Sequence, residues 1–207
     1  MDIRTFSNLL RGHNLGLFSV REAEVLFPAQ ATPLMLLQLH QWRRKGLIKR
    51  VKRGLYELAY PDQIVLPDFY VANKLYEPSY VSLETALSHY QLLPETAAQV
   101  TSVTSKATRR FKNSHGLFTY FSVRPRAFAG YTLIRLQGRT VRIAEPEKAV
   151  VDRLYMSLRR GEDWRIVCDR WDCGRIKKMN KNKLASYADL SGTSGAKIKE
   201  LIHVILR

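Results

Sequence analysis

Apolar positions three and four residues apart recur along the N-terminal part of the chain, which is the spacing of one helix face. The pattern predicts a first helix over residues 2–10 that ends near Gly12. Ser19 and Glu22 have the spacing of a capping box, in which each side chain bonds the backbone amide of the other. A second short helix is therefore expected to begin there and to stop at Pro28.

A third helix is expected to begin at Thr32-Pro33 and to stop at Gly46. Thr32 can cap this helix, and Pro33 at the first helical position loses no amide that would be paired. Two short alternating runs follow, residues 47–51 and 55–58, and they predict a hairpin. The buried stripe of the third helix is expected to consist of Met35 or Leu36, Leu39 and Trp42.

Cations dominate the segment from the end of the third helix through the hairpin. Seven of the eleven residues from 43 to 53 are Lys or Arg, and none is acidic. A charge run is often only a solvated face, but a hairpin directly after a helix is how a winged helix-turn-helix presents cations to DNA phosphates. Leu37 lies on the face that would read base edges, which favours backbone binding over sequence readout. The residues expected to bind DNA are Thr32, Gln38, Gln41, Arg43, Arg44, Lys45, Lys49, Arg50, Lys52 and Arg53.

The segment Tyr60-Pro61-Asp62 interrupts the pattern, so we place a domain boundary there. Residues 1–60 are predicted to form the winged helix-turn-helix. Residues 61–207 are predicted to form an α+β domain with a mainly antiparallel sheet and a helical tail from about residue 146. Its helices are expected at residues 68–77, 82–90, from Pro146 onward, 163–173 before Gly174, 181–190 and 196–206, and its strands at 100–104, 118–123, 131–136 and 140–143.

The composition is that of a globular protein with a large positive charge. Of 207 residues, 45% are hydrophobic, and the formal net charge is +16. Such a charge implies an acidic partner, with nucleic acid first, an acidic protein second and an anionic membrane surface third. No apolar run approaches the roughly 20 residues that cross a bilayer, and the N-terminus lacks the apolar core of a signal peptide. Cys168 and Cys173 form no disulfide framework, so we expect a cytoplasmic protein.

No Asp or Glu occurs between Glu95 and Glu145, whereas nine Lys and Arg do. Like charges over such a length repel one another unless an anionic surface lies against them. We therefore expect one strand face, with its cations at positions of equal parity, to contact an anionic surface. A second basic cluster, residues 175–183, is expected in a loop between helices. The residues expected at the anionic contact are Lys106, Arg109, Arg110, Arg124, Arg126, Arg135 and Arg139.

Three motifs follow one another in the chain, at residues 50–56, 80–95 and 144–155. The first is Arg-Val-Lys-Arg-Gly-Leu-Tyr, the second has an aromatic-aliphatic-Ser start and a Leu-Pro-Glu exit, and the third starts a helix with Pro-Glu-Lys-Ala. In this order they resemble AbiEi-type antitoxins, the antitoxin half of a bacterial abortive-infection toxin–antitoxin pair. Gln91 stands where many members have Gly, a departure that concerns the local turn. The resemblance covers about residues 15–160.

The resemblance implies a winged helix that binds inverted repeats in the promoter of its own operon and represses transcription. It also implies that the C-terminal domain counteracts a nucleotidyltransferase-like toxin, directly or functionally. We therefore expect an antitoxin and repressor without enzymatic activity, cofactor or metal. A standalone repressor whose C-terminal domain only dimerises is an alternative.

Read from the residues themselves, the second and third motifs are structural. Ser82 is expected to be a helix N-cap and not a nucleophile. Lys148 and Asp152 have the spacing of a helical i,i+4 pair worth a few tenths of a kcal/mol. His89 is expected to be a hydrogen-bonded core histidine.

A metal-dependent nuclease is the alternative from another class, because basic proteins with scattered carboxylates can cut nucleic acid. The usual Glu-x-Lys spacing is absent, and Asp68 falls in a predicted helix. The five histidines are scattered along the chain. Cys168 lies on an apolar helix face that is expected to pack in the core, and it has too few partner cysteines for a zinc site. The carboxylates and lysine that would form a nuclease site are Asp68, Glu145, Glu147 and Lys148.

Overall fold

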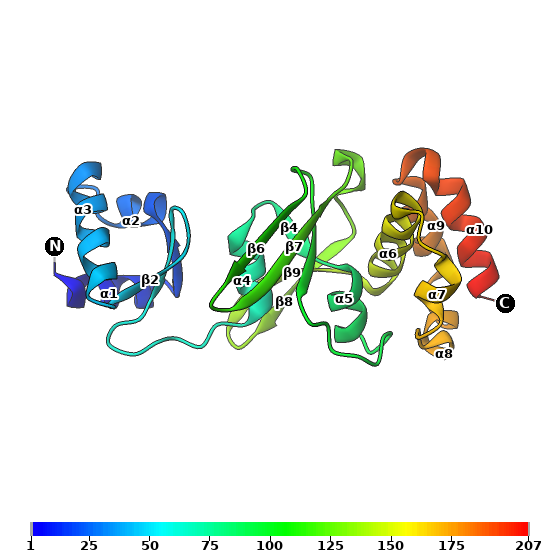
Figure 1. Ribbon diagram of the computed structural model, residues 1–207, viewed down its shortest axis with the longest axis horizontal. Helices are drawn as coiled ribbons and strands as arrows, with labels where there is room; N and C mark the ends of the chain where they lie inside the picture. Colours follow the sequence, from blue (N-terminus) through cyan, green and yellow to red (C-terminus); the bar gives the residue numbers. More distant parts are fainter. Residues whose placement is uncertain (1, 207) are drawn as a thin grey trace. The chain divides into compact units, whose positions relative to one another are not determined.

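The computed structural model describes residues 2–206, and the chain divides into two compact units (Figure 1). The first unit extends to Pro67 and the second begins at Asp68. Residues 59–67 between the last strand of one unit and the first helix of the other form neither helix nor strand. The boundary predicted at residue 60 falls inside this segment.

The first unit contains three helices and three strands over residues 3–58. Its strands form a three-stranded antiparallel sheet in the order β1-β3-β2. The three helices and the hairpin predicted from the sequence are confirmed, whereas β1 was not predicted because three residues are too short to show a pattern. The elements are α1 Ile3–Gly12, β1 Leu17–Ser19, α2 Val20–Leu26, α3 Thr32–Arg44, β2 Ile48–Lys52 and β3 Leu55–Leu58.

An aromatic cluster forms the core of the first unit. The fully buried Phe6 ring lies 5.2 Å from the Phe18 ring and 4.8 Å from the Trp42 ring, measured between centroids. The linker is held to α1, since Ser7 Oγ donates a hydrogen bond to the Tyr60 carbonyl at 2.9 Å. This contact explains why residues beyond 60 stay with the first unit.

Of the two helix caps predicted at the N-terminal ends of α2 and α3, one is confirmed and one is wrong. The capping box is confirmed, because the Ser19 amide donates to Glu22 Oε2 at 2.7 Å and the Glu22 amide donates to Ser19 Oγ at 3.1 Å. The cap predicted at Thr32 is wrong, because α3 starts one residue earlier: the Ala31 carbonyl accepts from the Met35 amide at 3.0 Å.

The second unit is built around a six-stranded mixed sheet in the order β6-β7-β5-β4-β9-β8. The pairs β4–β9 and β5–β7 are parallel and the other pairs are antiparallel, so the whole chain has a mixed α/β fold. The prediction of a mainly antiparallel sheet did not include the strands β4 and β6. One of the two parallel pairs, β4–β9, involves the unpredicted strand β4. The strands are β4 Ser79–Val81, β5 Val100–Thr104, β6 Arg109–Asn113, β7 Gly116–Ser122, β8 Tyr131–Leu136 and β9 Arg139–Ala144.

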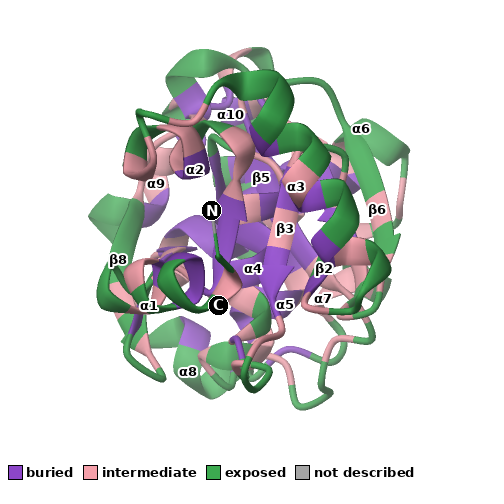
Figure 2. Cartoon of the chain, turned by 90° about the vertical axis from the view of Figure 1, so that its left-hand side faces the viewer, coloured by how far each residue is buried: buried purple, intermediate pink, exposed green. Residues whose placement is uncertain are grey.

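Helices pack on both faces of this sheet, α4 on one and α5 with α6 on the other (Figure 1). Tyr120 on β7 points to α4, where its hydroxyl donates to the Ala72 carbonyl at 2.6 Å. The central strand β4 is buried at every residue, as expected for a strand covered on both faces, and Figure 2 shows the buried residues around β5 in purple. The helices that cover the sheet are α4 Asp68–Leu75, α5 Leu83–His89 and α6 Pro146–Arg160.

The C-terminal helices differ from the prediction in one place. The helix expected over residues 163–173 is two short helices, and Gly174 lies inside the second of them. The break is possible because Asp163 and Asp172 each cap a helix start, accepting from the amides of Arg165 and Arg175. The elements are α7 Trp164–Cys168, α8 Cys173–Lys177, α9 Lys181–Asp189, the 3-10 turn η2 Gly192–Ser194 and α10 Gly195–Ile205.

A buried ionic cluster joins β4 to α6. The Lys148 and Asp152 side chains form an ion pair, and each residue is 1% exposed. Tyr80 Oη donates to Asp152 Oδ2 at 3.0 Å, and Ser82 Oγ donates to the same oxygen at 2.8 Å. Burial and the neighbouring Asp152 carboxylate raise the pKa of Tyr80 well above its usual value.

This cluster corrects two predictions. Ser82 stands at the N-cap position of α5 but makes no side-chain capping bond, because its hydroxyl serves Asp152 instead. The Lys148–Asp152 pair forms at the predicted i,i+4 spacing, but the expected contribution of a few tenths of a kcal/mol is too small, because the pair is in the core, where removing one partner has a much larger effect. The second and third sequence motifs therefore meet at one buried point.

Candidate nucleic-acid interface

Helix α3 presents an apolar face to the core and another to the surface. Its buried side is Met35, Leu39 and Trp42, as predicted. Leu34 and Leu37 are 57% and 54% exposed, and they lie one helical turn apart. Thr32 and Gln41 are exposed and Gln38 is half-buried, so the polar residues expected to bind DNA lie beside these leucines.

The end of α3 fixes where its cations point. Gly46 has φ +72, and the Leu47 amide donates to the Trp42 carbonyl at 3.0 Å, which closes the helix and turns the chain into β2. Arg44 and Lys45 are exposed at this end, and Arg43 is half-buried. Cations here are also favoured by the partial negative charge of a helix C-terminus.

The β2–β3 hairpin carries the remaining cations. Arg50 pairs with Tyr56 and Lys52 with Leu55, so the strand has a bulge at Val51. Because the bulge breaks the alternation, Val51 turns toward the core and Arg50 stays exposed. Gly54 completes the tight turn with φ +77.

The hairpin cations differ in how far they are engaged within the protein. Lys49 Nζ donates to Gln63 Oε1, and Gln63 Nε2 donates at 3.2 Å to the buried Glu57. The side chains of Arg50 and Arg53, by contrast, are exposed and make no hydrogen bond or ion pair with residues 2–206. Arg50 and Arg53 are therefore the hairpin side chains most available to an anion.

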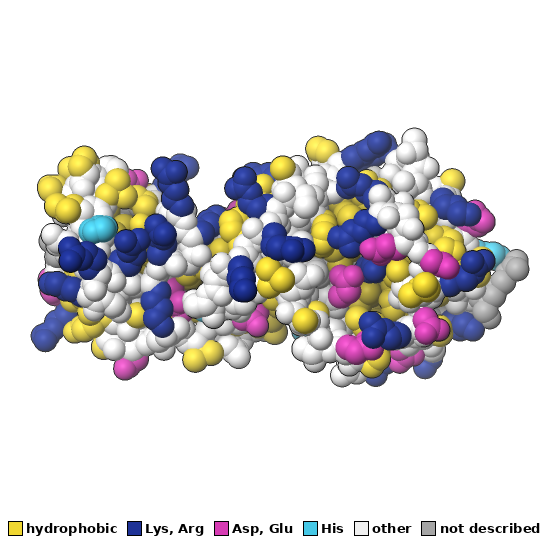
Figure 3. Space-filling model, viewed as in Figure 1, with side chains coloured by type: hydrophobic (Ala, Val, Ile, Leu, Met, Phe, Trp, Pro, Cys, Tyr) yellow, Lys and Arg dark blue, Asp and Glu magenta, His cyan; other side chains and the backbone are white. Residues whose placement is uncertain are grey.

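Figure 3 shows this surface of the first unit, with hydrophobic side chains gathered over α3 and Lys and Arg side chains next to them. A surface with cations around an apolar centre can bind a polyanion that also offers apolar groups. Phosphate oxygens are suited to the cations, and thymine methyl groups are the apolar groups of DNA that are suited to the leucines.

The acid-free stretch does not form one cationic strand face, so this prediction is wrong. Lys106 lies just before edge strand β6, which carries Arg109 and Arg110, whereas Arg135 lies on the opposite edge strand β8. Arg124 and Arg126 flank Pro125 in the short 3-10 turn η1 Pro125–Ala127, where the parity of a strand does not apply.

Arg139 is not a surface contact either. It is 7% exposed on β9, and its guanidinium lies 5.4 Å from the centroid of the Tyr70 ring. At the β6 edge of the sheet, Lys106 and Arg109 both lie over the Tyr76 ring, at 5.7 and 5.6 Å from its centroid. The sheet edge thus holds part of its charge against aromatic rings.

Residues considered for catalysis are mostly engaged elsewhere. Glu145 accepts hydrogen bonds from Lys183 Nζ at 2.6 Å and Tyr187 Oη at 2.9 Å, which lower the pKa of Glu145. Lys148 is in the buried cluster, and Asp68 begins a helix. No group of three His, Cys, Asp or Glu side chains within residues 2–206 could hold a metal ion.

Three smaller predictions concern His89, Cys168 and the basic residues 175–183. His89 is exposed against the Phe69 and Tyr90 rings and is not a core histidine. Burial raises the pKa of Cys168 to about 12, so the thiol is a poor nucleophile. The basic cluster at 175–183 is largely helical, since α8 and α9 include most of it.

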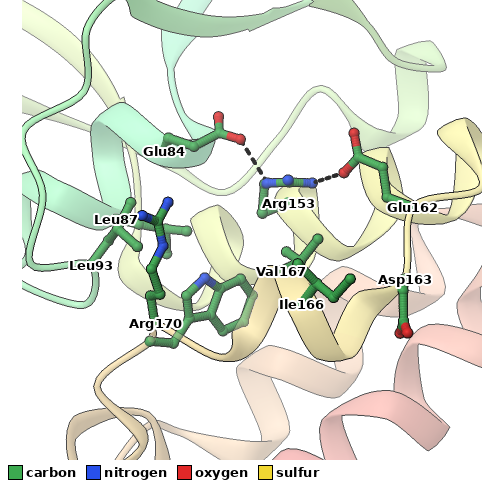
Figure 4. Close-up of a pocket in the computed structure, with 10 residues that line it drawn as sticks. Glu84, Leu87, Leu93, Arg153, Glu162, Asp163, Ile166, Val167 and Arg170 are labelled. Atoms are coloured by element: carbon green, nitrogen blue, oxygen red, sulfur yellow. Dashed lines mark hydrogen bonds and ion pairs between the residues drawn. The ribbon is translucent and has the colours of Figure 1, made fainter.

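The second unit contains a cavity of about 470 Å³ that no sequence pattern predicted (Figure 4). Arg153 lies in its wall between two carboxylates, 2.7 Å from Glu84 and 2.8 Å from Glu162. Apolar side chains, including Leu87, Ile166 and Trp171, complete the lining. Because Arg153 on α6 is paired with Glu84 on α5 and with Glu162 after the end of α6, this arginine joins α5 and α6 to the segment that leads into α7.

No protein-family model matches the chain, and no curated protein matches it. Among solved structures, the fold is similar to that of the RV2827C protein from Mycobacterium tuberculosis, with a TM-score of 0.59 and 12% sequence identity. The match covers 98% of this chain and 75% of that chain. At this identity the likeness concerns the fold. Within residues 2–206, no helix combines the length and the apolar character needed to cross a membrane.

Proposed function

We propose that the first unit is a winged helix-turn-helix that binds double-stranded DNA. The observation that carries the proposal is the cationic surface made by the end of α3 and the β2–β3 hairpin, with Arg50 and Arg53 exposed and unpaired within residues 2–206. The order helix, strand, helix, helix and two-stranded hairpin is the order that a winged helix requires. In this proposal α3 enters the major groove and the hairpin lies along the phosphate backbone.

We further propose that the whole chain is the antitoxin of a toxin–antitoxin pair and represses its own promoter. Support comes from the resemblance of residues 50–56, 80–95 and 144–155 to AbiEi-type antitoxins. The last two motifs supply Tyr80, Ser82, Lys148 and Asp152, which meet in one buried cluster. The second and third motifs therefore contact each other in the core, which gives a physical reason for their occurring together in one chain.

The partner in this proposal is a nucleotidyltransferase-like toxin encoded beside this chain, counteracted by contact or functionally. The test is co-expression of the full chain with the neighbouring gene, together with a reporter driven by the DNA upstream of the pair. We expect normal growth and a repressed reporter. Arg50→Ala/Arg53→Ala should release the reporter while growth stays protected, because the two effects belong to different units.

The outcome also separates the alternatives. Repression without protection would indicate a standalone repressor. Cleavage of the upstream DNA by the purified chain in the presence of Mg²⁺ would indicate the nuclease. The absence of both repression and protection would reject the proposal as a whole.

A further inference from the structure

Two arginines of the turn η1 meet over a glycine of the turn η2. A Cβ atom placed on Gly192 would lie 2.2 Å from Arg126 Nη2 and 2.9 Å from Arg124 Nη1. Both guanidinium groups therefore lie against the bare backbone of Gly192, which has φ +70. Figure 3 shows Lys and Arg side chains gathered at the top of the second unit, where Figure 1 brings the end of the sheet beside the start of the last helices.

The two guanidinium nitrogens are close enough to repel each other. Because both distances start from one point, Arg126 Nη2 and Arg124 Nη1 are at most about 5.1 Å apart. Both side chains are exposed, and neither guanidinium group makes a hydrogen bond or ion pair with any residue from 2 to 206. Like charges at this spacing are held together most readily by an anion that both can bind.

Carboxylates of the protein do not fill this role. The stretch that contains η1 has no Asp or Glu from residue 96 to residue 144. On the other side, Asp189 is bound to Lys199 at 2.6 Å and Glu200 is bound to Lys197 at 2.9 Å. The nearest acidic residues along the sequence of α9 and α10 are therefore already paired.

We propose that Arg124, Arg126 and Gly192 form a binding site for a phosphate group. An oxygen that accepts hydrogen bonds at about 2.9 Å from each nitrogen fits between donors that are this far apart. Arginine binds phosphate oxygens through paired N–H groups, which a tetrahedral anion can accept from two sides. The glycine is part of the site, because any side chain at 192 would occupy the space of the guanidinium groups.

This site is independent of the proposed DNA interface, because it lies entirely in the second unit. The phosphate can belong to a free nucleotide or to the backbone of a nucleic acid. Both sources present the same oxygens, so the site is defined by its chemistry and the source is determined by experiment.

The test uses the full chain with Arg50→Ala/Arg53→Ala, which removes the hairpin cations from the measurement. Binding of inorganic pyrophosphate is measured by calorimetry, and binding of a fluorescent 12-nucleotide RNA is measured by anisotropy. The variant Arg124→Ala/Arg126→Ala should weaken binding roughly tenfold or more, since each charge-assisted hydrogen bond is worth at least that factor. The matched control Lys112→Ala/Arg135→Ala removes the same charge from exposed strand positions outside the site.

The variant Gly192→Ala tests the geometry separately from the charge. Its Cβ displaces the two guanidinium groups while the net charge is unchanged, so binding should also fall, and a melting curve checks that the fold is retained. The site is supported if either probe binds and if both Arg124→Ala/Arg126→Ala and Gly192→Ala weaken that binding. The probe that binds more tightly shows whether the phosphate belongs to a free nucleotide or to a nucleic acid. The proposal is overturned if neither probe binds, or if the control lowers binding as much as Arg124→Ala/Arg126→Ala.

Discussion

The buried cluster of Lys148 and Asp152 makes a strong prediction about stability. In Lys148→Met the apolar volume is kept, but Asp152 loses its cation inside the core. Breaking a buried ion pair on one side costs about 3–5 kcal/mol. Asp152 would keep the hydrogen bonds from Tyr80 and Ser82, so we expect a loss near the lower end, about 3 kcal/mol.

The matched control is Lys183→Met, which removes a lysine from a pair on the surface. Lys183 Nζ binds Glu145 at 2.6 Å, but the lysine side chain is 48% exposed and solvent screens the pair, so the loss of stability should be much smaller than for Lys148→Met. The double variant Lys148→Met/Asp152→Leu removes both charges of the buried pair. Its loss of stability should be smaller than the sum of the losses for Lys148→Met alone and Asp152→Leu alone.

The measurement is urea unfolding of the full chain, followed by hydrogen exchange in peptides that cover β4 and α6. Those peptides report the second unit alone, so unfolding of the first unit does not enter the comparison. Equal losses for Lys148→Met and Lys183→Met would refute the reasoning, because they would mean that the burial of the pair does not matter.

Three further predictions concern other parts of the chain. Burial raises the pKa of Tyr80 and Tyr120 and raises that of Tyr90 to about 12. The folded state therefore keeps these phenols neutral at a pH where the unfolded chain ionises. The free energy of unfolding should be constant with respect to these groups below about pH 10 and should fall above it. Tyr120→Phe should make that fall shallower in urea titrations at increasing pH, and an unchanged slope would contradict the assignment. If Leu34 and Leu37 contact thymine methyl groups, replacing thymine by uracil in the bound duplex should weaken binding to the native chain but not to Leu34→Ala/Leu37→Ala. Residues 68–207 alone should protect cells from the cognate toxin, and protection by residues 1–67 alone would reverse the division of labour.

The local elements could be predicted because their signals are local. The capping box at Ser19, the glycine stop at Gly46 and the two arms of the hairpin each depend on residues within a few positions of one another. Thr32 failed because the neighbouring Ala31 could start the helix as well, and a difference of one residue is smaller than sequence patterns resolve.

The arrangement of the second unit depended on contacts that are distant in sequence. The parallel pairing of β4 with β9 joins residues 81 and 143, and no local pattern marks it. Asp152 was predicted to pair only with Lys148, because its further partners Tyr80 and Ser82 lie about 70 positions earlier and no local pattern connects them. The charge of residues 96–144 was evident in the sequence, but its division between opposite sheet edges and η1 was not.

In the proposed function, the end of α3 and the β2–β3 hairpin bind DNA phosphates. The most direct measurement is the dependence of the dissociation constant on salt, for a duplex taken from the DNA upstream of the gene. Each phosphate contact contributes about 0.9 to the slope of log K against log salt. We predict that Arg50→Ala/Arg53→Ala lowers this slope by up to about two units. Arg4→Ala/Arg165→Ala, which removes two exposed charges elsewhere, should leave the slope unchanged. An identical slope and affinity for the native chain and the hairpin variant would contradict the account.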